Sequence, residues 1–209
     1  MPSRGERMVR AVAGLAALAV LAGCGSTSLV NMWRDPQYSA APVRSALVIA
    51  VRKDQVRRRI WEDTFVAALG KDGVQATPSY QIFPDQMPDT NAVREHVRQK
   101  GYDAVIVTSR AGKQELTNYV PGYVTKEPVS VYRPMWNSYV TRYRDVYHPG
   151  YTETDTAFHI QTELWAVTGE GRLVWSGTSR TISPGSSNAF SHEVAELVVE
   201  ELHKAHLIP

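Results

Sequence analysis

The sequence predicts an α/β (α+β) fold in which a mixed sheet packs against helices. In the first half, short apolar runs alternate with amphipathic segments in the order β-α-β-α-β. The second half holds two segments of alternating polarity joined by a glycine-rich turn, which is typical of an antiparallel hairpin. An amphipathic segment at the carboxyl end adds a last helix.

The elements of the first half are recognised by their hydrophobic pattern and by the residues at their ends. Asp54 offers an N-cap for the first helix, and Gly101 ends the second. In chain order we expect a strand at 46–51, a helix at 55–69, a strand at 74–77, a helix at 90–100 and a strand at 104–109.

The first helix carries a concentrated run of arginines. On a helical wheel Val56 falls on the apolar half, and Arg58 and Glu62 fall on the opposite half with Arg59 and Asp63. The i,i+4 spacing pairs Arg58 with Glu62 and Arg59 with Asp63, which predicts a solvated face of ion pairs. The alternative is a basic patch for an anionic partner, made of Arg57, Arg58 and Arg59.

The second half predicts a hairpin followed by a helix. Its strands are expected at 156–166 and 172–178, and the helix at 189–206 with Ser187 or Asn188 as its cap. Between the halves lies a tyrosine- and proline-rich insertion at 113–151.

The aromatic residues of this insertion are the best candidates for a partner surface, because rigid amphipathic rings are enriched at interfaces. The last four tyrosines recur every four residues, which fits either one stripe of a helix or one face of a strand. Flanking prolines favour extended or looped structure over a long helix. A flap whose rings cover the sheet of the domain is the competing interpretation. The candidates are Tyr119, Tyr123, Tyr132, Trp136, Tyr139, Tyr143, Tyr147 and Tyr151.

Composition excludes several classes of protein. The chain has 209 residues, 43% apolar and 21% charged, which suits one folded domain. A formal net charge of +2 is a poor basis for nucleic-acid binding. The single cysteine excludes an internal disulfide and a cysteine-rich zinc site.

The amino end has the pattern of an export signal. Basic residues precede an apolar run at 11–22, which reaches only about 18 Å as a helix, too short to cross a bilayer. The following Leu21-Ala22-Gly23-Cys24 resembles the lipobox of bacterial lipoproteins. This resemblance implies cleavage between Gly23 and Cys24 and lipidation of Cys24. Because Gly25 is not the aspartate that retains such proteins in the inner membrane, it also implies an outer-membrane, periplasm-facing location.

These signals divide the chain into a signal peptide at 1–23, a lipidated tether at 24–45 and one periplasmic domain at 46–209, with the segment around Trp33 a candidate to pack on that domain. The whole pattern resembles a group of bacterial envelope lipoproteins that share a domain of unknown function. The resemblance implies an α/β sandwich, loosely similar to the periplasmic domains of envelope-assembly lipoproteins, and brings no catalytic residues. It rests on Trp33, Asp35-Pro36, Leu47–Val51, Arg58, Glu62-Asp63, Gly73, Thr77–Tyr80, Gly101–Val105 and Leu173–Gly177.

Candidate catalytic groups are sparse. His192, Glu196 and His203 could line one side of the last helix, but the wheel places them on its solvent face. We therefore expect no enzyme, metal or cofactor, and a lipid-anchored module that binds an envelope protein or a glycan. A carrier holding glycan or lipid between sheet and tyrosine-rich flap is the alternative, and a metal-dependent hydrolase is a remote third.

Overall fold

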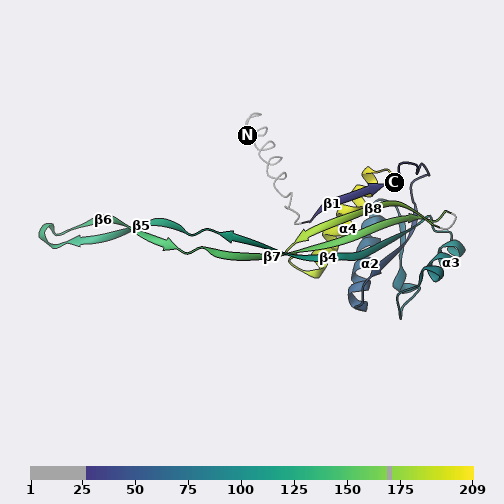
Figure 1. Ribbon diagram of the computed structural model, residues 1–209, viewed down its shortest axis with the longest axis horizontal. Helices are drawn as coiled ribbons and strands as arrows, with labels where there is room; N and C mark the ends of the chain where they lie inside the picture. Colours follow the sequence, from purple (N-terminus) through teal and green to yellow (C-terminus); the bar gives the residue numbers. More distant parts are fainter. Residues whose placement is uncertain (1–26, 169–170) are drawn as a thin grey trace, which may run out of the picture.

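The computed structural model describes residues 27–168 and 171–209, so the predicted signal peptide at 1–23 and Cys24 lie outside the described residues. The described chain forms a body from which a long, thin arm projects (Figure 1). A mixed six-stranded sheet, a separate two-stranded sheet and three α-helices make up these residues, and they confirm the predicted α+β class.

The elements follow the predicted order, with longer strands in the second half. Asp54 caps α2 as predicted, Asp89 caps α3, and Gly101 ends α3 with a φ of 70°. Ser186, rather than Ser187 or Asn188, caps α4, because its side chain accepts the Ala189 backbone N–H. The elements are β1 Thr27–Arg34, β2 Ser45–Val51, α2 Gln55–Lys71, β3 Gln75–Pro78, η2 Ser79–Gln81, α3 Thr90–Lys100, β4 Ala104–Val120, β5 Tyr123–Arg133, η3 Pro134–Trp136, β6 Ser138–His148, β7 Tyr151–Ala166, β8 Arg172–Ile182 and α4 Ser187–Lys204.

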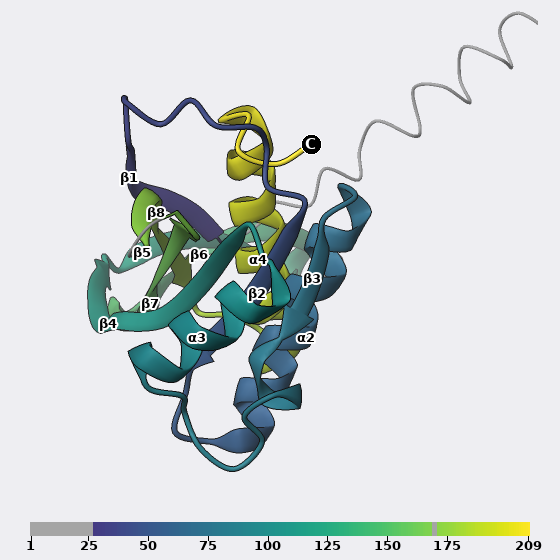
Figure 2. The ribbon, with the colours of Figure 1, turned by 90° about the vertical axis from the view of Figure 1, so that its right-hand side faces the viewer.

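The six-stranded sheet has the order β1-β8-β7-β4-β2-β3. β2 pairs in parallel with β3 and β4, while β4, β7, β8 and β1 are joined by antiparallel pairing. Because side chains alternate between the two faces of a strand, the sheet presents two apolar surfaces. The helices α2 and α4 cover one face and α3 covers part of the other (Figure 2).

The larger core lies under α2 and α4. Phe65 from α2 and Leu202 from α4 are fully buried there against Val48, Leu164 and Trp175 of the sheet. The smaller core lies under α3, where Val97 packs with Leu47, Ile49 and Val105. Burial of these side chains on both faces explains why β2 reads as a continuous apolar run.

The predicted tether is shorter than expected. Residues 27–34 form β1, an edge strand paired with β8, so the body begins well before residue 46. Asp35 then accepts hydrogen bonds from the Arg172 guanidinium and the Gln37 backbone N–H. These contacts fasten the segment that sequence alone assigned to a linker.

Across the described ranges, none of the helices has the length and apolar character that crossing a bilayer requires.

Candidate functional site

The arm, defined here as residues 114–156, contains most of the predicted insertion. β4 and β7 run out of the body side by side, and their pairing continues to Val120 opposite Tyr151. β5 and β6 continue the same direction as a separate two-stranded ribbon (Figure 1). The predicted flap is wrong, because this segment points away from the sheet of the body instead of covering it.

The four-residue spacing of the tyrosines belongs to a strand. In β6 the residues Tyr139, Tyr143 and Tyr147 lie on one face of the ribbon, and Tyr132 of β5 lies opposite Tyr139. The Tyr132 and Tyr139 rings are 5.1 Å apart between centroids. We call these four residues the tyrosine stripe. Tyr139, Tyr143 and Tyr147 are 73%, 69% and 68% exposed, so nothing in the described chain packs over them.

The opposite face of the ribbon carries valines among charged residues, including the Arg144–Glu127 ion pair. It carries Val129, Val131, Val140 and Val146, which the register places together on the side away from the tyrosine stripe. A sheet normally hides one apolar face against a core. In the described ranges no layer lies behind either face of this ribbon, so both surfaces are open to a partner.

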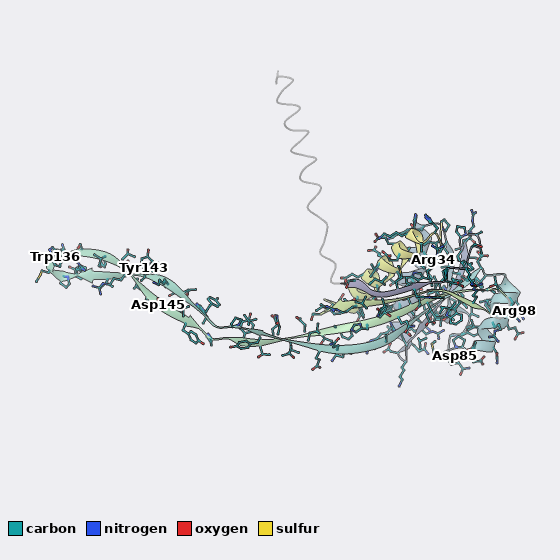
Figure 3. The ribbon with its side chains drawn as sticks, turned by 45° about the horizontal axis from the view of Figure 1, so that its top comes forward. Arg34, Asp85, Arg98, Trp136, Tyr143 and Asp145 are labelled. Carbon is teal, nitrogen blue, oxygen red and sulfur yellow. The ribbon has the colours of Figure 1, made fainter. Side chains whose placement is uncertain are left out.

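The tip of the arm adds a compact aromatic group. The η3 turn exposes Met135 and Trp136 to 85% and 67%, and Asn137 closes it with a φ of 44°. The Arg133 guanidinium lies 5.6 Å from the Trp136 ring centroid, within range of a cation–π interaction. Figure 3 shows Trp136 at the far end of the arm, with Tyr143 and Asp145 nearer the body.

Two glycines form the joint between the two parts of the arm. A Cβ on Gly122 would meet the His148 carbonyl oxygen at 2.7 Å, and one on Gly150 would meet the Tyr119 hydroxyl at 2.5 Å. Each glycine also faces the backbone of the other. This close approach requires glycine at both positions. The preceding Pro121 and Pro149 each lack the amide proton that a ladder would use.

The outer edges of the ribbon are unpaired. β5 and β6 bond only to each other within the described residues, which leaves a row of backbone donors and acceptors along each outer side. Such edges are ready to accept another strand. Pro128 within β5 is tolerated because both strands are edge strands.

The predicted aromatic residues outside the stripe also lie on the arm but do not join one surface. Tyr119 and Tyr151 are near the joint, while Tyr123 stacks on His148 with 4.6 Å between ring centroids. The Thr125 hydroxyl lies 2.9 Å from His148 Nε2, at the edge of that ring. The arm therefore has three parts, which are the joint at Gly122 and Gly150, the tyrosine stripe, and the tip with Met135 and Trp136.

The predicted solvated face of α2 is wrong for Arg58 and Glu62, both of which are fully buried. Arg58 Nε lies 3.0 Å from Glu62 Oε1, and its other nitrogens donate to Ser79 Oγ and the Phe83 carbonyl. Glu62 also accepts from the Ala50 backbone N–H, the Ser79 hydroxyl and the Tyr80 backbone N–H.

This network holds α2 against β2 and the η2 turn, so its role is structural. The predicted basic patch loses its central member Arg58, while Arg57 and Arg59 remain exposed and Arg59 lies 5.5 Å from the Tyr80 ring. Val56, placed on the apolar half by the wheel, is 67% exposed. The buried side of α2 is set by three neighbours, the sheet, α4 and the η2 turn, and is therefore broader than one simple stripe.

A second basic group lies near the start of α2. Arg52 stacks on Trp61 at 4.3 Å, and Trp61 meets Phe190 edge-on at 5.2 Å. Burial, together with the positive charge of Arg110, lowers the pKa of Arg52 to about 10.

Two aspartates of the family pattern fix backbone at the sheet. Asp103 is partly desolvated, which by itself raises its pKa, but the backbone N–H groups of Arg44 and Ser45 outweigh this and lower it. The Arg172 guanidinium, with the Gln37 N–H, lowers the pKa of Asp35. Both carboxylates are committed to structural hydrogen bonds.

The histidines of α4 lie where the wheel predicted. His192, Glu196 and His203 are exposed, although Val199, which lies between them on the same side of the helix, is buried. Glu196 forms an ion pair with Lys71 at 3.0 Å. In the part of the chain that the structure describes, no three His, Cys, Asp or Glu side chains are grouped closely enough to hold a metal ion.

Comparison with known proteins gives distant structural likenesses. No family model and no curated protein matches the sequence. The structure is similar to a PelC dodecamer subunit from Paraburkholderia phytofirmans, with 12% identity, a TM-score of 0.44 and coverage of 88% of this chain and 99% of that one. It is also similar to the lipoprotein GNA1162 from Neisseria meningitidis, with 15% identity, a TM-score of 0.38 and coverage of 77% and 98%. These likenesses are too distant to carry a statement about activity or partners.

Proposed function

We propose that the chain is a non-enzymatic binding or assembly module of a bacterial cell envelope. In this proposal lipids on Cys24 hold it at the outer membrane, the body faces the periplasm, and the arm binds an envelope protein. A glycan is the second class of partner that tyrosine rings suit, since they stack on sugars.

The exposed tyrosine stripe on an unsupported ribbon is the observation that carries the proposal. Large exposed apolar patches mark interaction sites in soluble proteins. Tyr139, Tyr143 and Tyr147 offer ring area with few rotatable bonds, which keeps the entropy cost of binding low. The unpaired edges of β5 and β6 add backbone hydrogen bonding as a second means of recognition.

The geometry also suits capture at a distance. At about 3.3 Å per residue, the arm extends on the order of 60 Å beyond the body. The anchor rests on the lipobox sequence, Leu21 to Cys24. Two or three acyl chains at one cysteine would hold the protein stably, because a single chain binds a membrane only marginally.

Excision of the arm tests the partner-binding role. Because Val120 and Tyr151 are paired, residues 121–150 can be replaced by an Asn-Gly hairpin turn that keeps the register. We expect the shortened protein to keep the melting temperature of its body and to lose the partners recovered by crosslinking in intact envelopes. If it recovers the same partners as the full chain, the proposed role is wrong.

A photocrosslinking residue at Tyr143 gives the matched measurement, with the same group at the exposed Arg57 of α2 as control. We expect specific adducts from Tyr143 alone, and adducts from Arg57 alone would place the interface on the body. Binding of isolated peptidoglycan, measured for the full chain and for the shortened protein, tests whether the arm binds a glycan.

The anchor is tested separately by labelled palmitate. We expect Cys24→Ser to lose the label and to leave the membrane fraction. Retention of the processed variant on membranes would contradict lipid anchoring.

A further inference from the structure

The face of the sheet opposite α2 and α4 is only partly covered, and a groove lies between it and α3. The groove has a volume of about 440 Å³, within the roughly 300–1,000 Å³ typical of small-molecule sites. Its lining is mostly apolar. The sheet supplies Ile49, Val105, Val107 and Trp165, and Met87 and Val93 close it from the side of α3.

The groove is lined by two basic side chains and one acidic side chain. Arg94 and Arg98 line it from successive turns of α3, so both lie on the same side of the helix. In the ranges 27–168 and 171–209, Arg94 takes part in no ion pair. The acidic lining residue, Glu163, already accepts hydrogen bonds from Gln161 and the Trp165 indole.

Arg98 lies at one end of the groove, and Arg94 lies one turn further along α3. Only three residues separate α3 from β4, so the carboxyl end of α3, with Arg98, lies beside the start of β4. Figure 3 shows Arg98 at the end of the body opposite the arm. Val107, further along β4, and Met87, before α3, line the other end, where the Glu163 carboxylate, opposite Val107 in the register, already accepts hydrogen bonds from Gln161 and Trp165.

We propose that this groove binds a single-chain fatty acid. The carboxylate would accept hydrogen bonds from the Arg94 and Arg98 guanidiniums, whose planar donors match a carboxylate in geometry and charge. The acyl chain would lie over Val105 and Val107 toward Met87. Each methylene removed from water contributes about 0.8 kcal/mol. A glycan does not suit the groove, because its hydroxyls would face apolar side chains and lose hydrogen bonds with water.

This inference does not depend on the proposed role of the arm, because groove and arm lie at opposite ends of the molecule (Figure 3). It places a ligand site under α3, whereas the carrier alternative drawn from the sequence placed one under a tyrosine-rich flap.

Direct binding can be measured on the full chain carrying Cys24→Ser, so that no acyl chain of its own competes. The probe is cis-parinaric acid, a fluorescent fatty acid, titrated into the protein and displaced by palmitate. We expect saturable binding of one molecule per chain. The methyl ester of palmitate should compete at least tenfold less well, since it lacks the charge that Arg94 would meet. Equal competition by acid and ester, or no saturable binding, would overturn the proposal.

Substitutions locate the site. We expect Arg94→Gln to weaken palmitate binding roughly tenfold through loss of a charge-assisted hydrogen bond, while Arg57→Gln on the exposed side of α2 leaves it unchanged. Val107→Phe should block the groove, with circular dichroism to confirm that it folds. Equal loss in both arginine variants would show that net charge alone attracts the fatty acid, and would overturn the site.

Quenching provides a readout that does not depend on a groove-filling variant. Palmitate brominated along its chain quenches indole fluorescence on contact, and Trp165 is the tryptophan among the groove-lining residues. We expect quenching in the parent protein and its loss in Trp165→Phe, with cis-parinaric acid still bound. Unchanged quenching in Trp165→Phe would place the fatty acid elsewhere.

Discussion

The body and the arm use similar residues in opposite ways. In the body, valine, leucine and aromatic side chains are closed between sheet and helices, as Phe65 and Trp175 are. In the arm, tyrosines and valines also lie along β5 and β6, but no layer from the described residues covers either face. Apolar patterning therefore determines that a strand forms, while its place in the chain determines whether the strand supports a core or presents a surface.

Hydrogen exchange should show the largest difference between the two regions. Amides buried in β2 should exchange only through global unfolding, which for a domain costs on the order of 5–15 kcal/mol. A two-stranded ribbon is marginally stable in water, so amides of β5 and β6 should be protected by about 1–2 kcal/mol at most. Amide exchange followed by mass spectrometry measures both. Equal protection in the free protein would mean that another chain already covers the arm.

Arg58→Ala should be the most damaging single change in the body. It leaves the fully buried Glu62 without its charged partner, and breaking such a pair costs about 3–5 kcal/mol. Chemical denaturation measures the loss of unfolding free energy. Arg57→Ala, one residue away and exposed, should change that free energy by less than about 0.5 kcal/mol. A similar small change in Arg58→Ala would show that Glu62 is not held as a buried anion.

The stability of the attachment of β1 to the rest of the body should depend on pH. The Arg172 guanidinium, followed by the Gln37 N–H, lowers the pKa of Asp35. A lowered folded-state pKa means that this stabilisation is complete above the ordinary aspartate value of about 4 and is lost as pH falls through the folded value. In the parent protein the amide exchange rate of β1, relative to the intrinsic rate at each pH, should rise as the pH falls through that acidic range. In Asp35→Asn the exchange rate of β1, taken relative to the intrinsic rate at each pH, should be raised at all pH values and should not change with pH. Asp85→Asn, on an exposed turn, should behave like the parent.

Changes in the tyrosine stripe should have the smallest effect on stability. Replacing Tyr139, Tyr143 and Tyr147 together by serine removes exposed rings, so we expect the melting temperature of the body to stay within a few degrees. Partner capture by crosslinking should nevertheless fall to the level seen with the shortened protein that lacks residues 121–150. Threonine at the same positions, which favours strands, separates loss of the rings from loss of ribbon structure. Full capture by the threonine variant would show that the edges of the ribbon alone bind.

The sequence predicted the body better than the arm because the body is defined by local signals. The helix expected at 90–100 is α3, and its ends follow from Asp89 and Gly101. The strand expected at 104–109 continues to Val120, because its outer part carries polar residues that an apolar-run criterion misses. The useful signal there was the density of β-branched and aromatic residues in 123–133 and 138–148.

Burial of charge was the other feature that local patterns could not provide. The i,i+4 spacing of Arg58 and Glu62 was visible, but a wheel assigns charged residues to solvent. Their burial depends on Ser79 and Tyr80, which reach them only after the chain has passed through β3. Residues 27–34 were assigned to a tether for a similar reason, since their partner strand β8 lies far along the chain.

The early start of β1 has a consequence for how such a molecule would search for its target. Thr27 lies three residues after Cys24, a stretch that can extend about 10 Å at most. If Cys24 carries the proposed lipid, this short stretch keeps the body next to the bilayer, and the far end of the arm reaches targets only in the shell around the membrane that the arm's own length defines. Confinement of this kind raises the local concentration of a binding site near any target within that shell, so weak contacts could suffice for capture.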